Sequence, residues 1–470
     1  MNTIPRLGAL LLFLGRLIRW RASAIGTLCT GGLVSLMLCG PALAVPSFAR
    51  QTGQSCVACH AGGQYPELTP YGRLFKLTGY TMGGRSNPLA MMLVASSTTT
   101  RNNDSGPSAP HNALNGPAIL DFASIFIAGK ASDNVGGFAQ YTNAFYDSQD
   151  ANGVWHNRFV ADNFDLRYAD RSVDANRDLI WGLTLHNNPT VQDVWNSTPA
   201  WGYPYVSTTQ AANGSLPAAT LLEGGLAQHV AGVGGYVYLN KNLYAELTSY
   251  QTAKGALSFL SYGNQPGDLA APLTHLDGNA LYWRLAYTKE WDAHNIMIGG
   301  MGLDAKVYQN DTVTTGLPLT ALGSTHFQDV GIDAQYQYLL APHTVTAHFR
   351  SVWEKIDDAT GLVYTDGSAN LHSTMAKASY VYRDKYGGSL AYMNVSGSPD
   401  TTAYGGLGPQ NVPDSERWTP ELFWLINQNT RVGAQFNLFT RYAGASSSYD
   451  GAGRNPSDNN TTYLYLWTAF

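Results

Sequence analysis

Period-two alternation of apolar and polar side chains is the feature that most constrains how this chain folds. Successive side chains of a β-strand point to opposite faces, so a strand with one apolar and one polar face alternates residue by residue. The segments DVGIDAQYQY (329–338), LYWRLAYT (281–288) and TVTAHFRSVW (344–353) follow this pattern. In the first segment, one face carries Val330, Ile332, Ala334, Tyr336 and Tyr338, and the other carries Asp329, Gly331, Asp333, Gln335 and Gln337. The sequence therefore predicts an all-β protein.

Connection lengths distinguish a membrane barrel from a soluble β-sandwich. Short turns such as NKN (240–242) and RDKY (383–386) alternate with long stretches rich in Gly, Ser, Asn and Pro, such as 188–225 and 397–416. This alternation is typical of an outer-membrane barrel, and a soluble sandwich has no reason to sort its loops in this way. Strands of roughly ten residues, the length that a tilted membrane strand requires, are expected to begin near residues 89, 118, 135, 158, 179, 226, 243, 279, 295, 327, 343, 371, 387, 417, 432 and 461, which makes sixteen.

The last residues support the barrel independently. The segment TYLYLWTAF (462–470) alternates and ends in Phe470. A terminal aromatic strand of this kind resembles the signal by which outer-membrane barrels are recognised for insertion. After residue 44 the chain has no apolar run of about 18 residues, the length that a membrane-spanning helix needs.

The first 44 residues have the features of a secretory signal peptide. Arginines precede the apolar run AIGTLCTGGLVSLMLCGPALA, which ends in the small-residue motif Ala42-Leu43-Ala44. The alternative is an inner-membrane anchor of similar length. Cleavage would remove Cys29, Cys39 and four arginines, so the net charge would change from −5 to −9, with 24 basic and 33 acidic residues remaining. This acidity argues against nucleic acid as a partner.

The segment QSCVACHAGG (54–63) brings two cysteines and a histidine together. Cys-X-X-Cys-His is the attachment motif of c-type haem, in which both thiols bind the porphyrin and the histidine binds the iron. A thioredoxin-like disulfide would need a strand-to-helix context, and a zinc site would need further ligands nearby. The sequence therefore predicts one covalent haem c on Cys56 and Cys59, with His60 as an axial iron ligand.

The second axial ligand is less constrained than the first. Met82 in GYTMGG is the nearest candidate after the motif. A methionine ligand raises the reduction potential of a haem, and a histidine ligand lowers it. Further candidates are Met91, Met92 and the lumen-facing His348.

Residues 66–80, PELTPYGRLFKLTGY, combine a short helical pattern with two cations. Arg73 and Lys76 are candidates to pair with the haem propionates, whose charges are costly to bury alone. The alternative is that both cations pair with an acidic lumen wall.

The expected architecture is a transmembrane antiparallel β-barrel of about sixteen strands, preceded by a short haem segment of helix and coil. The domains are a signal peptide (1–44), a monohaem cytochrome c segment (45–88) and a porin-like barrel (89–470). An even strand number leaves both chain ends on the periplasmic side, and a barrel of this size has a lumen that a plug can occupy. The haem segment is therefore expected at or inside the periplasmic end of the lumen.

One long loop carries a motif of its own, TVQDVWNSTPAWGYPY (190–205). We expect this loop to fold into the barrel mouth as a constriction, although its aromatic residues Trp195, Trp201, Tyr203 and Tyr205 could instead anchor the barrel at the membrane interface. Asp193 within it could contact a cation or stabilise a turn.

PSFARQTGQSCVACH (46–60), PELTPYGRLFKLTGY (66–80) and NNPTVQDVWNSTPAWGYPY (187–205) together resemble the fused cytochrome and porin proteins of the bacterial outer membrane. The best-known members of that family are iron-oxidising outer-membrane cytochromes. The resemblance spans essentially the whole chain after the leader and is specific in its first forty or so residues. It implies one haem on Cys56 and Cys59 with His60 as axial ligand, held at or within a porin-like barrel.

The expected function is transfer of single electrons across the outer membrane, from Fe(II) outside the cell to a periplasmic c-type cytochrome. If the chain is an enzyme, it is an Fe(II):cytochrome c oxidoreductase, and no residue is assigned a catalytic role. Outer-membrane lipid is the expected surrounding. The alternatives are a substrate-specific porin with a haem-bearing plug, and an electron conduit for another donor or acceptor.

Overall fold

The computed structural model describes residues 46–63, 67–103, 114–149, 153–198, 216–261, 273–311 and 315–470. The chain divides into two compact units, Met1–Ala42 and Leu43–Phe470. The first unit, and with it the predicted signal peptide and its cleavage motif, lies outside the described residues. All that follows concerns the second unit.

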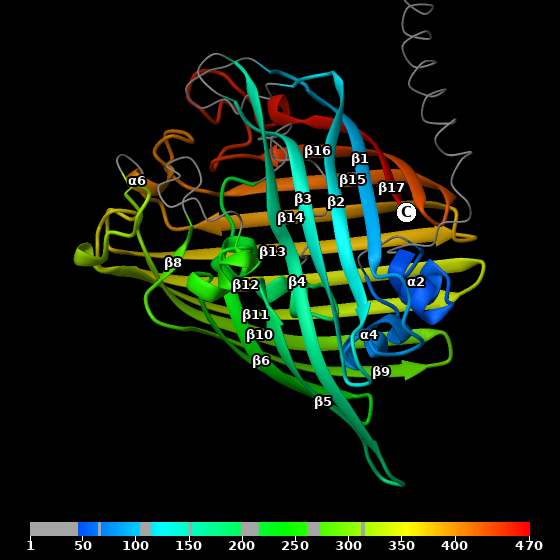
Figure 1. The fold of residues 1–470 in the computed structure, drawn as a ribbon. Coiled ribbons are helices and arrows are strands. Elements are labelled where there is room, and N and C mark those ends of the chain that lie inside the picture. Colours follow the sequence, from blue (N-terminus) through cyan, green and yellow to red (C-terminus); the bar gives the residue numbers. More distant parts are fainter. Residues whose placement is uncertain are drawn as a thin grey trace, which may run out of the picture. The chain divides into compact units, whose positions relative to one another are not determined.

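The strands of this unit form one closed antiparallel barrel (Figure 1). The sheet has seventeen strands, of which the two-residue β8 (His275–Leu276) lies beside β10, so sixteen strands make the wall. The ring closes where β1 pairs with both β2 and β17. The predicted sixteen-stranded antiparallel barrel is confirmed. The wall strands are β1 (Leu89–Thr100), β2 (Ala118–Lys130), β3 (Val135–Gln149), β4 (Trp155–Val173), β5 (Asp178–His186), β6 (Val230–Leu239), β7 (Leu243–Thr252), β9 (Ala280–Trp291), β10 (His294–Tyr308), β11 (Ser324–Leu340), β12 (His343–Asp358), β13 (Ser368–Tyr382), β14 (Tyr386–Gly397), β15 (Ser415–Asn427), β16 (Thr430–Arg441) and β17 (Thr461–Ala469).

The alternation in the sequence corresponds to the two surfaces of the wall. On β11, Val330 and Ile332 are 54% and 49% exposed on the outer surface, whereas Asp329 and Asp333 are each 2% exposed and face the lumen. The outer surface of the barrel is therefore apolar and the inner surface polar. A barrel with an apolar outer band and a polar interior is the arrangement found in outer-membrane β-barrels.

The two ends of the barrel differ in their connections. At one end, called here the turn end, neighbouring strands are joined by two to four residues, as at 131–134, 240–242 and 428–429. In the turn between β6 and β7, Asn240 and Lys241 have φ of 51° and 58°, the left-handed conformation that tight hairpin turns require. Most connections at the opposite end, the loop end, are longer. Because the strand number is even, the chain enters β1 and leaves β17 at the turn end.

The segment before the barrel forms three short helices, α2 (Pro46–Thr52), α3 (Cys56–Cys59) and α4 (Pro70–Leu77). It contacts lumen-facing residues of the wall. The Tyr80 hydroxyl donates to Asp165 of β4 (2.5 Å), and the Tyr236 hydroxyl of β6 donates to the Leu77 carbonyl (2.6 Å). The expected haem segment of helix and coil therefore sits against the inner wall. Within the described residues, no helix has the length and apolar character needed to cross a membrane.

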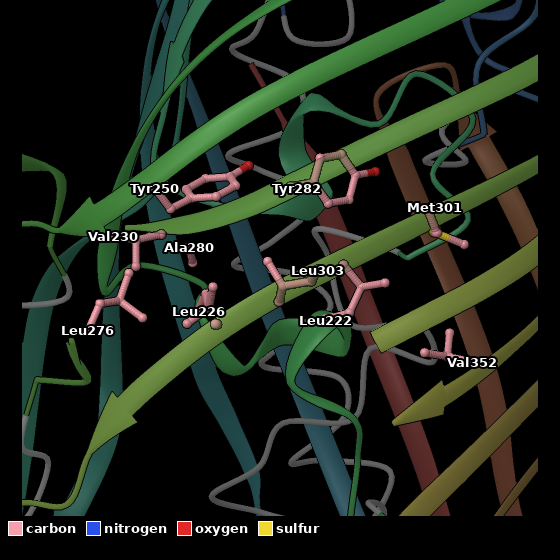
Figure 2. Packing of buried hydrophobic residues seen from close by; sticks show 11 residues of the cluster. Leu222, Leu226, Val230, Tyr250, Leu276, Ala280, Tyr282, Met301, Leu303 and Val352 are labelled. Atoms are coloured by element: carbon pink, nitrogen blue, oxygen red, sulfur yellow. The ribbon is translucent and has the colours of Figure 1, made fainter. Parts of the chain in front are cut away.

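The long connection between β5 and β6 also turns inward. Its π-helix η1 (Leu221–Gly225) is bonded to the wall, because the Leu222 amide donates to Asp329 (2.7 Å). Figure 2 shows Leu222 and Leu226 of this connection packed beside Leu303 and Tyr282 of the wall strands. The loop is thus held by apolar as well as polar contacts. The remaining helices are α5 (Pro189–Gln192) in the same connection, η2 (Gly255–Leu260), η3 (Thr320–Leu322), α6 (Thr401–Tyr404) and η4 (Pro456–Asn459).

Candidate functional site

The Cys-X-X-Cys-His motif occupies a single helical turn. Cys56 and Cys59 are the first and last residues of α3, and residues three apart in a helix lie on one face. His60 follows in an extended conformation, with its amide donating to the Cys56 carbonyl (2.8 Å). The helix thus presents both thiols on the same side and ends at the histidine.

Helix α4 packs directly against this turn and is hydrogen-bonded to it. The Thr69 amide donates to the Cys59 carbonyl (2.9 Å), and the Thr69 hydroxyl donates to the Ala58 carbonyl (2.5 Å). Thr69 also caps α4, because its hydroxyl accepts from the Gly72 amide (3.1 Å). A Cβ on Gly72 would lie 2.2 Å from the Cys59 carbonyl oxygen. Only glycine therefore permits this approach of the two helices.

A cavity of about 970 Å³, measured to its open mouth, adjoins the motif. This volume includes the solvent at the open mouth. The cavity is walled by three parts of the described chain: the N-terminal segment, the inner surface of two strands, and the β5–β6 connection. Lining residues include Cys56, Cys59, His60, Phe75, Lys76 and Tyr80 of the first, Phe126 and Phe138 of the second, and Val191, Asp193 and Val194 of the third.

The lining fits a haem. Aromatic side chains dominate the apolar wall, with Tyr80 stacked on Phe48 (5.3 Å between ring centroids) and packed edge-on against Phe75 and Phe138. Two thiols and an imidazole, the groups that attach and ligate a c-type haem, open onto the same space. The residues present therefore match the cofactor that the sequence predicts.

The thiols lack the low pKa of redox-active cysteines. Burial, together with the neighbouring Cys56, raises the pKa of the Cys59 thiol to about 11. Redox-active cysteines work as thiolates and usually have lowered pKa values. The described residues also contain no cluster of three or more His, Cys, Asp or Glu side chains suited to a metal ion.

Of the two predicted cations, only Lys76 lines the cavity. Its ammonium donates to the Val191 carbonyl and lies 3.9 Å from Asp165. Burial and the nearby Arg167 guanidinium lower the pKa of Lys76 to about 8.

Arg73 instead points to the barrel wall. Its guanidinium donates to Asn295 (2.6 Å), Gln335 (3.1 Å) and Gln337 (3.2 Å). These partners are neutral amides. They are not the acidic residues of the lumen wall that were the expected alternative to the haem propionates. Arg73 fastens the haem segment to β10 and β11.

None of the predicted second axial ligands is among the described residues that line the cavity. The Met82 backbone carbonyl accepts a hydrogen bond from the Gln51 side chain (2.9 Å), and Met82 is not among the residues that line the cavity. Met91 and Met92 belong to β1, and Met91 faces outward with 40% exposure. His348 faces the lumen but lies beside Glu67 (4.0 Å).

The β5–β6 connection covers the cavity from the lumen side. Asp193 accepts hydrogen bonds from the Trp195 and Ser197 amides (2.9 and 2.8 Å). It therefore stabilises a turn, which was one of the two roles expected for this residue. The Arg284 guanidinium of β9 lies over the Trp195 ring (5.1 Å) and bonds Asp333 of β11 (2.6 Å). The expected inward fold of the loop is confirmed for its described parts, while Trp201, Tyr203 and Tyr205 lie outside them.

Several residues of the site were not predicted. Asp165 of β4 accepts from Tyr80 and is paired with Lys76 and Arg167, and Phe126 and Phe138 wall the cavity. Each occupies an inward position of an alternating strand, which was the available signal. Alternation indicates which face of the strand a residue occupies. It does not show which residue of the N-terminal segment will lie against that residue.

No protein-family model matches the sequence, and no curated protein matches it either. Among solved structures, the outer membrane channel DcaP of Acinetobacter baumannii is 11% identical, with a TM-score of 0.45, covering 81% of this chain and 96% of that chain. Salmonella typhi OmpF in complex with daunomycin is 13% identical, with a TM-score of 0.42 and coverage of 81% and 97%. The anion-selective porin from Comamonas acidovorans is 11% identical, with a TM-score of 0.41 and coverage of 81% and 98%.

The chain forms a closed sixteen-stranded antiparallel β-barrel with the apolar outer surface and polar interior of a transmembrane barrel. Its N-terminal segment presents a Cys-X-X-Cys-His motif to a cavity beside the inner wall of the barrel.

Proposed function

We propose that this protein carries single electrons across the bacterial outer membrane through one haem c attached to Cys56 and Cys59. The observation that carries the proposal is the cavity in which both thiols and His60 meet an aromatic wall inside the barrel. A bound haem supplies a one-electron change of its iron. The chain holds the macrocycle by two thioethers, ligates the iron through His60, and excludes bulk water with the loop that covers the cavity.

The architecture supports an orientation in the membrane. Short turns of outer-membrane barrels face the periplasm and long loops face outward. The cavity mouth is lined by the exposed Gln54 and Ser55, and the Cys56 sulfur lies 3.3 Å from the Gln428 carbonyl in a turn-end connection. An attached haem would therefore lie near the periplasmic surface, within reach of a soluble c-type cytochrome as electron acceptor.

Fe(II) is the proposed donor. It gives up one electron at a time, which matches a single haem, and its ferric product precipitates near neutral pH. Oxidation on the outer side of the haem segment keeps that precipitate out of the periplasm. If the protein is counted as an enzyme on this account, it is an Fe(II):cytochrome c oxidoreductase.

Stopped-flow spectroscopy of the purified haem-loaded protein tests the donor. We expect Fe(II) to reduce the ferric haem at the working pH, and a periplasmic cytochrome to reoxidise it. The matched control is the double variant Cys56→Ser/Cys59→Ser, which cannot form the thioethers. Failure of Fe(II) to reduce a correctly attached haem would exclude the iron donor, and reduction by another donor would retain the conduit.

The porin-like barrel supports a second candidate, a substrate-specific porin whose haem segment is a plug. Inward polar residues such as Gln335 and Arg350 suit a water-filled lumen. Against free passage, Glu67 is bound to Lys377, and Arg73 to β10 and β11, so the plug is fastened on several sides. Planar-bilayer recording separates the two functions, because an electron conduit of this design conducts little ion current, whereas a porin conducts and selects solutes.

A further inference from the structure

We propose that Lys76 supplies the second axial ligand of the haem iron, opposite His60. The inference rests on the proposed function, because it requires a haem on Cys56 and Cys59. It replaces Met82, the candidate nearest in sequence, with a residue that the fold brings to the cavity.

The first argument is the set of ligating atoms around the cavity. Of the described residues that line it, only His60 and Lys76 carry a basic nitrogen, and none is a methionine. Two oxygen donors, Tyr80 and Asp193, are otherwise engaged. The Tyr80 hydroxyl donates to Asp165 (2.5 Å), and both Asp193 oxygens accept backbone amides.

The second argument is the face of α4 that adjoins the motif. Gly72 and Lys76 are four residues apart, so they lie one above the other on the same face of the helix. Gly72 packs directly on the Cys59 carbonyl, and both Gly72 and Lys76 line the cavity. Lys76 therefore extends from the same helix face one turn further along, about 5.4 Å.

The third argument is that Lys76 can move without leaving a buried carboxylate alone. Asp165 already accepts from Arg167 (2.9 Å) and from Tyr80 (2.5 Å), whereas Lys76 lies 3.9 Å away. Among the described residues, the hydrogen bond that Lys76 would give up is to the Val191 carbonyl. Its flexible four-carbon stem allows the change of direction.

The ligation step is balanced within the chain and solvent. The amine binds as a neutral group, so one nitrogen–iron bond forms and the ammonium proton passes to water at the cavity mouth. No oxidant or reductant is needed. Since sulfur ligation by methionine raises the potential, a nitrogen ligand gives a lower haem potential than methionine would.

The test is the ligand-field spectrum of the ferric haem, independent of any electron donor. We expect the unaltered protein to be low-spin, without the red sulfur-to-iron absorption band of a methionine ligand. Lys76→Ala and Lys76→Arg should both become high-spin and bind added imidazole at least tenfold faster. Lys76→Arg is the sharper variant, because it retains the buried cation yet cannot deprotonate to bind iron. The control Met82→Leu should leave the spectrum unchanged.

Three results would overturn the inference: a methionine band in the unaltered protein, a low-spin haem retained in Lys76→Arg, or loss of the low-spin state in Met82→Leu. The methionine band is measured on the unaltered protein. It can therefore contradict the inference even if a Lys76 variant fails to assemble. Failure of the proposed function looks different. It would appear as absence of covalent haem by mass and by the pyridine haemochrome assay.

Discussion

Gly72→Ala is the substitution that most directly tests how the haem segment is built. The new Cβ would lie 2.2 Å from the Cys59 carbonyl oxygen and 2.9 Å from its carbon, so α4 must move away from α3 by about an ångström. Overpacking of this kind costs about 1–3 kcal/mol. The movement also strains two hydrogen bonds of Thr69, each contributing about 1 kcal/mol.

Helix propensity opposes this loss only in part. Replacing glycine by alanine within a helix gains about 1 kcal/mol. The net destabilisation of the seated segment is therefore about 3 kcal/mol, and every 1.4 kcal/mol is a tenfold change in an equilibrium constant. The opened segment should become on the order of a hundred times more populated.

Native-state proteolysis measures that population. When opening and closing are fast relative to cleavage, the cleavage rate follows the equilibrium fraction of the open form. We expect residues 45–88 to be cut on the order of a hundredfold faster in Gly72→Ala than in the unaltered protein. Gly84→Ala is the matched control, because Gly84 lies in the same segment and its Cβ would meet nothing within 4 Å. Equal cleavage rates in the two variants would refute the packing argument.

Three further outcomes follow from the contacts of the segment. Arg73→Met should speed the same cleavage, since it leaves the amide oxygens of three wall residues unpaired at a cost of about 3 kcal/mol or more in total. An unchanged rate would show that water replaces the guanidinium without loss. Burial alone would raise the pKa of Glu67, but Lys377 and His348 hold this pKa below its ordinary value. The stabilisation from Glu67 is therefore complete above the unfolded-state pKa and is lost as pH falls through the folded-state value. The rate at which protease cuts the segment should therefore rise at acid pH in the unaltered protein, and Glu67→Gln should weaken this pH dependence. Deletion of residues 45–88 should raise single-channel conductance at least tenfold over the intact barrel, and equal conductance would mean that the segment does not close the lumen.

The barrel was predictable from sequence because its governing signal is local. Each strand repeats the same two-residue pattern, so the predicted starts near 226 and 371 lie close to the observed Val230 and Ser368. Strand length was less predictable. β4 runs for 19 residues, well beyond the ten or so that cross a membrane, because pairing continues past the apolar band.

The site was predictable only where its parts are adjacent in the chain. Cys56, Cys59 and His60 form one motif, whose spacing specifies the chemistry. Which residues face that motif depends on the fold of the plug inside the lumen. Met82 is close in sequence yet outside the cavity lining, whereas Val194 is distant in sequence and part of it. Sequence distance therefore ranks candidate ligands poorly in a segment whose surroundings are supplied by the barrel.

The described residues that line the cavity all fall between Phe48 and Asn196. The eleven wall strands from β6 onward, and the loops that join them, contribute none of these lining residues. Apart from the turn 428–429, whose Gln428 carbonyl lies 3.3 Å from the Cys56 sulfur, the connections of this later part of the chain can therefore change in length and charge without altering the lining of the cavity. The division separates two kinds of adaptation in one molecule: the cavity lining can be kept constant while the connections at the loop end diversify.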